Sequence, residues 1–304
     1  MRHRALQRFC IGLSDFPNRL DSISFSVKAA AIATLGWVVF SLVLGHIAPM
    51  YGILASGSLM MLYLLLLIFT IIRQLNTLLR FRVYDERALQ AMAGVYLSLK
   101  PEKPLPFLRS AALSTDTCLE YIRLIKEIRL KLILELGGGS SSLIAGYQLK
   151  LNGEGRLIAI DHEKKWGEIT EGNLLRHGLA DVAEVRIAPL KAIELNGREY
   201  NWYDLKEFED IVSIDILLID GPPDTSDGGL RYPGLELLYR RLSHGGVILI
   251  DDCVMPRWNK QVLDWAKERG FEVESFYLNE KNTLLLRHNR HVSTWGDGGA
   301  GGLE

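Results

Sequence analysis

The distribution of hydrophobic residues divides the chain into two parts. From residue 29 to residue 72 there is no Asp, Glu, Lys or Arg, and Met60–Phe69 is apolar throughout. Such a segment leaves no polar helix face for water. A helix over these 44 residues would be about 66 Å long, roughly twice the hydrocarbon core of a bilayer. The pattern therefore predicts two transmembrane helices, over 28–46 and 50–72, separated near Pro49.

Basic residues flank this uncharged stretch on both sides, and the loop between the two predicted helices has no Lys or Arg. Because cytoplasmic segments of membrane proteins carry the excess of basic residues, we expect both ends of the hairpin on the cytoplasmic side of the cell (inner) membrane. The long leader and the second, more hydrophobic span argue against a cleaved signal peptide. The flanking basic residues are Arg2, Arg4, Arg8, Arg19 and Lys28 before the stretch, and Arg73, Arg80, Arg82 and Arg87 after it.

Beyond residue 110, short apolar runs alternate with amphipathic segments. This alternation is typical of βαβ units, which form a parallel sheet with helices on both faces. The last two runs are joined by a short loop, so this pair must be antiparallel. The predicted fold class is α/β, with a Rossmann-like seven-stranded sheet preceded by two transmembrane helices. Strands are expected at 132–136, 156–160, 183–187, 214–219, 246–250, 271–276 and 283–286, and helices at 141–151, 164–177, 232–242 and 257–269.

These patterns divide the chain into five regions. A connector after the hairpin is polar and partly helical to about Leu99, and three closely spaced prolines then break the helix. The glycine-rich C-terminus is expected to be disordered. The regions are a cytoplasmic basic leader (1–27), two transmembrane helices (28–73), the connector (74–110), the α/β domain (111–290) and the disordered tail (291–304).

Composition excludes several classes of function. The formal net charge is −1 and no basic cluster is interleaved with aromatic residues, so nucleic acid is not an expected partner. Cys10, Cys118 and Cys253 are scattered, so neither a zinc site nor a disulfide framework is indicated, which fits a reducing compartment. No feature of the sequence bears on the oligomeric state.

A glycine-rich turn follows the first strand of the predicted sheet, in the order Glu135-x-Gly137-x-Gly139. Glycines let the backbone approach a ligand closely. The dinucleotide fingerprint needs a third glycine where Ser142 stands, which weakens an NAD interpretation. Asp161 ends the second strand, where a carboxylate suits the two ribose hydroxyls of a nucleoside.

Carboxylates end four of the five expected parallel strands: Glu135, Asp161, Asp220 and the pair Asp251-Asp252. Ligands of open α/β sheets bind beyond the carboxyl ends of the strands. This concentration of negative charge suits a sulfonium cation with an ammonium group, or a metal ion, and not a polyphosphate.

Residues 133–256 resemble class I S-adenosylmethionine (SAM) dependent methyltransferases, most closely a bacterial branch with five short signatures. The resemblance implies that SAM is the cofactor. The signatures are Ala188-Pro189-Leu190, Trp202-Tyr203-Asp204, Asp220-Gly221-Pro222-Pro223, Arg231-Tyr232-Pro233 and Asp251-Asp252. The residues that the resemblance assigns to SAM are Glu135, Gly137 and Gly139 for the methionine part, Asp161 for the ribose, His162 and Ala188 for the adenine, and Ser141 as a further cofactor-binding residue.

The domain is also similar to catechol-type O-methyltransferases, which bind a divalent metal through an Asp after strand four and an Asp-Asn pair after strand five. Asp220, Asp251 and Asp252 resemble those positions, with Asp252 replacing the Asn. Three oxygen ligands suit Mg²⁺ or another divalent cation, which would lower the pKa of an acceptor hydroxyl. The alternative is that Asp251 and Asp252 cap the next helix or bind the Pro-Pro loop. The lysine that those enzymes carry shortly after the first Asp is missing here, and Asp220 and Asp251 are the candidate bases.

We therefore expect a membrane-anchored SAM-dependent methyltransferase that methylates an oxygen of a small or membrane-associated acceptor, such as a lipid-linked glycan or a quinone-like lipid. Its other partner is the lipid bilayer. One alternative is an NAD or nucleotide-sugar enzyme, but a catalytic Tyr-x-x-x-Lys is missing because Ser243 stands four residues after Tyr239. A non-catalytic SAM-binding membrane scaffold would carry the same binding motifs and stays an alternative.

Overall fold

The computed structural model divides into two units, Met1–Glu86 and Arg87–Glu304. The predicted leader (1–27) and the predicted disordered tail (291–304) lie outside the residues that the structure describes. The described residues are 35–36, 39–40, 42–43, 46, 49–106, 108, 112–128, 131–223, 231–253, 256–275 and 281–288.

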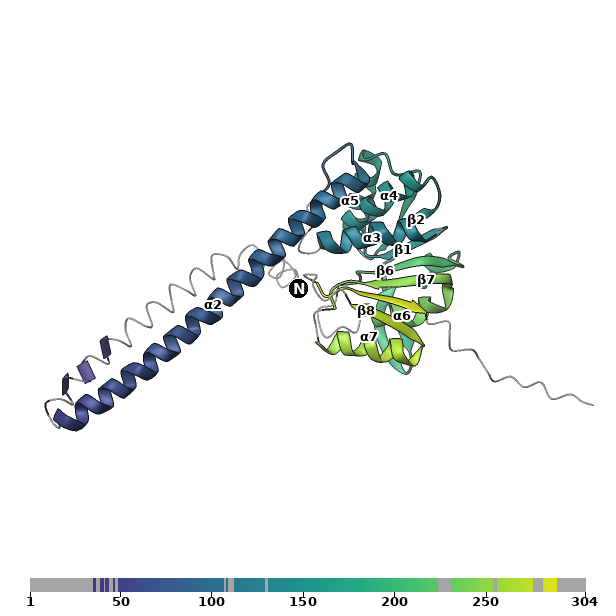
Figure 1. Cartoon of the computed structure of the whole chain (residues 1–304). Helices are drawn as coiled ribbons and strands as arrows, with labels where there is room; N and C mark the ends of the chain where they lie inside the picture. Colours follow the sequence, from purple (N-terminus) through teal and green to yellow (C-terminus); the bar gives the residue numbers. More distant parts are fainter. Residues whose placement is uncertain are drawn as a thin grey trace, which may run out of the picture. The chain divides into compact units, whose positions relative to one another are not determined.

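A long helix, α2 (Pro49–Leu99), contains 51 residues and is drawn in blue in Figure 1. It begins at Pro49, whose fixed φ suits a helix N-terminus, and it ends before Lys100-Pro101, because proline disfavours helical backbone in the residue before it. The helix expected over 50–72 therefore continues through the first part of the connector.

Among the described residues, no helix is long and apolar enough to cross a membrane. Most of the predicted span over 28–46 lies outside the described residues, and 50–72 is part of α2. Both transmembrane assignments stay predictions.

The C-terminal unit contains a seven-stranded sheet in the order β3-β2-β1-β6-β7-β9-β8 (Figure 1). Neighbouring strands from β3 to β7 are parallel, and β9 is antiparallel to both β7 and β8. The structure thus confirms a seven-stranded mixed sheet. The strands are β1 (Leu132–Leu136), β2 (Arg156–Asp161), β3 (Ala183–Ile187), β6 (Ile214–Ile219), β7 (Leu242–Ile250), β8 (Phe271–Ser275) and β9 (Leu284–His288).

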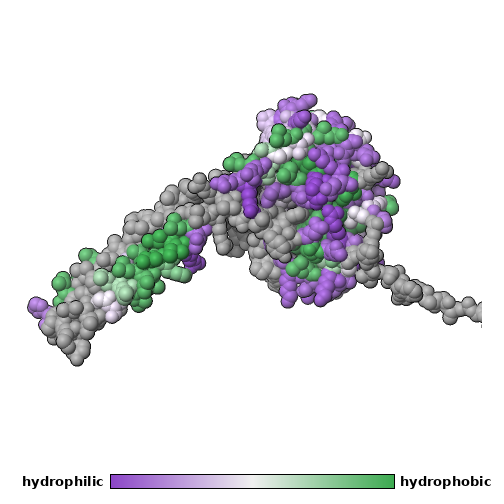
Figure 2. Space-filling model, in the orientation of Figure 1, coloured by the Kyte–Doolittle hydropathy of each residue, from purple (hydrophilic) through white to green (hydrophobic). Residues whose placement is uncertain are grey.

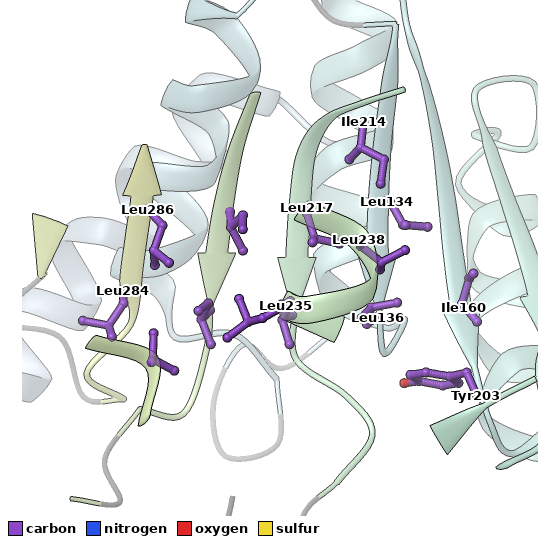
Figure 3. Close-up of a cluster of buried hydrophobic side chains, with 14 of the residues drawn as sticks. Leu134, Leu136, Ile160, Tyr203, Ile214, Leu217, Leu235, Leu238, Leu284 and Leu286 are labelled. Carbon is purple, nitrogen blue, oxygen red and sulfur yellow. The ribbon is translucent and has the colours of Figure 1, made fainter. Parts of the chain in front are cut away.

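Helices cover both faces of this sheet, because successive residues of its central strands point to opposite sides. In β6, Ile216 and Leu218 belong to one buried cluster, whereas Leu217 and Ile219 belong to the other, part of which Figure 3 shows. The helical segments after α2 are α3 (Thr115–Glu127), α4 (Ser140–Asn152), α5 (Lys164–Arg176), α6 (Tyr232–Leu238), α7 (Pro256–Glu268) and two short 3₁₀ turns, η1 (Leu205–Phe208) and η2 (Tyr239–Arg241).

A β-hairpin that the sequence analysis did not predict lies between β3 and β6. Its strands, β4 (Leu190–Leu195) and β5 (Arg198–Tyr203), pair with each other and with no other strand among the described residues. Asn196 and Gly197 form the turn with φ angles of 53° and 71°, which a tight hairpin of this kind requires. The hairpin ends in Trp202 and Tyr203, both fully buried in the second cluster.

Candidate functional site

The loop between β1 and α4 lies directly against the end of β6. The Gly137 N–H donates to the Ile160 carbonyl at 2.8 Å. A Cβ at Gly137 would lie 3.2 Å from backbone atoms of Asp220 and Gly221, and its φ is +93°. Only glycine meets both conditions without strain, so the first glycine of the motif fixes the distance between the loop and Asp220.

Glu135 is fully buried beneath this loop. Its carboxylate accepts hydrogen bonds from Tyr121 Oη at 3.0 Å, Ser142 Oγ at 2.5 Å and Ser141 Oγ at 3.3 Å. The Gly139 N–H donates to the Ser142 hydroxyl at 3.2 Å. Burial raises the pKa of Glu135 to about 7, although the three hydrogen bonds oppose the shift. Glu135 therefore links α3 and the start of α4 to the glycine loop, and its predicted contact with the methionine part of SAM stays a prediction.

The three residues predicted to border the nucleoside lie together beyond β2 and β3. The Asp161 carboxylate accepts the Glu163 N–H at 2.9 Å, and its Oδ1 lies 3.5 Å from His162 Nδ1. The Ala188 N–H donates to the Asp161 carbonyl at 2.8 Å. Burial raises the pKa of Asp161, and its hydrogen bonds and His162 oppose the shift. These contacts hold Asp161 at the tip of β2.

Tyr203, at the end of the hairpin, belongs to the Trp202-Tyr203-Asp204 signature, to which the sequence analysis assigned no role, and its position makes it a candidate site residue. Its ring makes an edge contact with His162 at 6.3 Å between centroids. A Cβ at Gly221 would collide with Tyr203 Oη, so the hydroxyl lies over the strand end. This buried hydroxyl has no hydrogen-bond partner among the described residues. A buried phenol without a partner is costly, which favours a ligand at this point.

Asp220, Asp251 and Asp252 converge, as the sequence analysis predicts. One carboxylate oxygen of each lies within 4.8 Å of the others. The cause is the register of β6 and β7, in which Ile219 pairs with Ile250. Asp220 and Asp251 therefore follow directly after paired residues of adjacent strands and lie side by side at the strand ends. Asp251 is fully buried, whereas the Asp252 side chain is 42% exposed.

Two buried cations meet these carboxylates. Lys281 Nζ lies 2.8 Å from Asp251 Oδ2 and 3.7 Å from Asp252 Oδ1. Arg231 Nη2 lies 3.5 Å from carboxylate oxygens of both Asp220 and Asp252. Arg231 also donates to the carbonyls of Asp251 at 2.7 Å and Asp220 at 3.1 Å. Its guanidinium therefore ties together the ends of β6 and β7.

The arrangement of the three carboxylates does not fit a divalent cation. Both oxygens of Asp251 already accept hydrogen bonds, from Lys281 Nζ at 2.8 Å and from Thr283 Oγ1 at 2.9 Å. A metal ion would need these oxygens at roughly 2.0–2.6 Å, beside the Lys281 ammonium. The like charges would repel, so we derive no catalytic step through a metal.

The residues on the other side of the site do fit SAM. Gly137 contributes loop backbone without a side chain, and Asp161 offers a carboxylate at the tip of β2. Tyr203 offers a buried hydroxyl that makes no hydrogen bond to any residue that the structure describes. These groups lie at the carboxyl edge of the sheet, where open α/β sheets bind nucleotide ligands.

The sequence of this domain matches a known family. The model of a family described as a methyltransferase domain matches residues 134–253. The comparison with curated proteins finds no match. The protein is a SAM-dependent methyltransferase.

Several solved structures are similar at low identity. Cofactor-bound Rv0187 from MTB is 18% identical with a TM-score of 0.45, over 67% of this chain and 91% of its own. The O-methyltransferase from Bacillus cereus is 19% identical with a TM-score of 0.45, over 66% of this chain and 88% of its own. The O-methyltransferase TomG from Streptomyces achromogenes is 18% identical with a TM-score of 0.44, over 66% and 90%.

Proposed function

We propose that the protein methylates an oxygen atom of a small or membrane-associated acceptor, with Asp220 as the base. The observation that carries this proposal is the position of Asp220, which adjoins Gly137 of the glycine loop. Burial raises the pKa of Asp220 well above its usual range, and the nearby Asp251 carboxylate raises it further, although Lys281 and Arg231 oppose the shift. The ionised carboxylate of Asp220 is therefore a stronger base than that of an ordinary aspartate, which suits a proton acceptor.

Methyl transfer requires little covalent chemistry from the protein. When bound, SAM supplies a methyl group activated by the sulfonium. An acceptor hydroxyl attacks well only as its proton leaves, so a base beside the acceptor oxygen accelerates the transfer. Asp220 would take that proton as the acceptor oxygen receives the methyl group, with S-adenosylhomocysteine as the leaving product, and would then pass the proton to water. Arg231 holds the strand ends that position Asp220, so orientation supplies much of the remaining effect.

The test uses methyl-labelled SAM, the full-length protein and two acceptor fractions, a lipid extract and a soluble small-molecule extract. We expect the label in an O-methyl product, identified by mass spectrometry and NMR. Asp220→Asn should reduce the turnover by about 10²-fold or more, as loss of a general base does, with SAM affinity retained. Label found only on nitrogen would contradict the proposal.

We further propose that the N-terminal hairpin anchors the enzyme in the cell membrane with the catalytic domain in the cytoplasm. The uncharged stretch over 29–72 and the basic residues on both sides of it support this proposal. An anchored enzyme would meet an acceptor that is itself held at the membrane, such as a lipid-linked glycan or a quinone-like lipid.

The surface of α2 gives the anchor further support. Large apolar side chains between Met60 and Ile72 are 43–67% exposed, and Figure 2 shows their green surface along the helix. Soluble monomers seldom expose apolar patches of more than a few hundred Å², so a bilayer is the partner that this surface fits. The exposed residues are Met60, Met61, Leu62, Leu64, Leu65, Leu66, Ile68, Phe69, Ile71 and Ile72.

A further inference from the structure

Lys281 reaches the carboxylate cluster because of the order of the strands. In the sheet, β9 lies beside β7 and runs antiparallel to it, and Leu284 pairs with Ile250. The segment just before Leu284 therefore lies opposite the segment just after Ile250. This places Thr283 and Lys281 against Asp251.

The Lys281 side chain is 8% exposed and has two carboxylate partners. Burial alone would lower its pKa, but Asp220, Asp251 and Asp252 outweigh this effect and raise the pKa. The side chain is therefore an ammonium ion at physiological pH. A buried charge is tolerated when it is paired and hydrogen-bonded, as this one is.

The charges at the site are nearly balanced by the protein itself. Three carboxylates face two cations, Lys281 and Arg231, which leaves one formal negative charge. In a site that lacks these cations, three converging carboxylates would repel one another and attract a divalent ion. Here the ammonium supplies a positive charge at the oxygen atoms that such an ion would need.

We infer that the Lys281 ammonium takes the place of the divalent cation that the resemblance to catechol-type enzymes implies, so that methyl transfer proceeds without a metal. Lys281 is thus a positioning residue, which holds Asp251 and Asp252 and keeps the ends of β7 and β9 together. The part about methyl transfer rests on the proposed function, whereas the part about the cation site does not.

The first experiment measures Mn²⁺ binding to the full-length protein by electron paramagnetic resonance and needs no acceptor. We expect no specific binding by the wild type. Lys281→Ala should bind Mn²⁺ at least about tenfold more tightly than the wild type, because removing a like charge a few ångströms away favours the dication strongly. Adding Asp252→Ala to that variant, which removes the side-chain oxygens at this position, should abolish the gain. Lys260→Ala, which removes an exposed lysine of α7, is the matched control and should behave as the wild type does.

Two results would overturn the inference. One is Mn²⁺ binding by the wild type that Asp252→Ala removes, and the other is a folded Lys281→Ala that gains no binding. Lys281→Gln provides a second variant with a larger side chain, and circular dichroism checks the folding of both. In the labelled-SAM assay, wild-type turnover should be unchanged in excess chelator, and a loss of turnover that Mn²⁺ restores would likewise overturn it. If no methylated product forms at all, the proposed function fails while the Mn²⁺ result still decides the nature of the cation site.

Discussion

Glu135 titrates near neutral pH while fully buried, which makes the stability of the fold depend on pH. Its pKa is raised from 4.5 to about 7 in the folded protein, mainly by burial. The folded state therefore binds this proton more tightly than the unfolded state does. The contribution to stability is complete below pH 4.5 and is lost as the pH rises through about 7.

We predict that this single group lowers the free energy of unfolding by about 2 kcal/mol between about pH 5.5 and about pH 8. Denaturant unfolding at the two pH values measures the change. Glu135→Gln cannot titrate, so the difference between wild type and variant isolates Glu135 from other groups such as Asp161. An equal pH dependence in both proteins would show that Glu135 is already ionised in the fold.

The Tyr203 hydroxyl is buried and has no hydrogen-bond partner among the described residues. Removing it should therefore affect SAM binding without lowering the stability of the fold. We predict that Tyr203→Phe leaves the free energy of unfolding unchanged or raises it by about 1 kcal/mol, because an unsatisfied polar group is removed. SAM binding should weaken by about 1 kcal/mol in calorimetry, the net worth of one hydrogen bond. Asp161→Ala is the comparison variant, with an expected loss of about 1.5–3 kcal/mol in SAM binding. Unchanged SAM affinity for Tyr203→Phe would place the hydroxyl outside the cofactor site.

At the scale of elements, the strands of the central sheet were predictable and the hairpin was missed. The run over 132–136 is apolar apart from Glu135 and ends at a glycine, so β1 was predicted with its observed bounds. The hairpin strand β4 consists of half-buried and exposed residues without strict alternation, a weaker pattern than a fully buried run. The Asn196-Gly197 turn was nevertheless a strong hairpin signal that would have found it.

Gly197 and Gly172 have different backbone conformations, so replacing each by alanine should change the stability in opposite directions. Gly197 has a φ of +71° in the hairpin turn, with open space around a Cβ, so Gly197→Ala should cost about 1 kcal/mol of stability through backbone strain alone. Gly172 lies inside α5, also with no atom near a Cβ, so Gly172→Ala should add about 0.5–1 kcal/mol. Thermal unfolding of both variants compares the signs. A gain of stability from Gly197→Ala would contradict the assigned turn geometry, and a loss from Gly172→Ala would contradict the open helical position assigned to that residue.

At the scale of the whole molecule, the sequence predicted which strand ends bring their carboxylates together. It did not predict the lysine that neutralises part of their charge. Asp220 and Asp251 follow consecutive parallel strands, so their convergence follows from the general topology of α/β sheets. Lys281 belongs to no motif, and it reaches them only because β9 lies between β7 and β8. Such a non-sequential order has no local signature, so the cation that changes the chemistry of the cluster could not be assigned from the chain alone.

The proposed membrane anchor predicts a topology. A reporter fused after Glu304 should be cytoplasmic, and a tag inserted between His46 and Tyr51 should react only with reagents outside the membrane, because the positive charges lie on the other side. Alkaline extraction should leave the full-length protein in the membrane pellet. A protein released into the supernatant, or a loop tag protected from outside reagents, would contradict the anchor.

A pair of substitutions on α2 tests whether the uncharged stretch is responsible. Leu65 is 59% exposed within that stretch, and Leu97 is 75% exposed on the same helix beyond it. Leu65→Arg would place a charge in the hydrocarbon, at a cost of about 2.5–3.5 kcal/mol in insertion, so a larger fraction of the protein should appear in the alkaline supernatant. Leu97→Arg adds the same charge outside the stretch and should leave the fraction unchanged. Equal release of both variants would mean that general destabilisation, and not the loss of a membrane-spanning segment, is the cause.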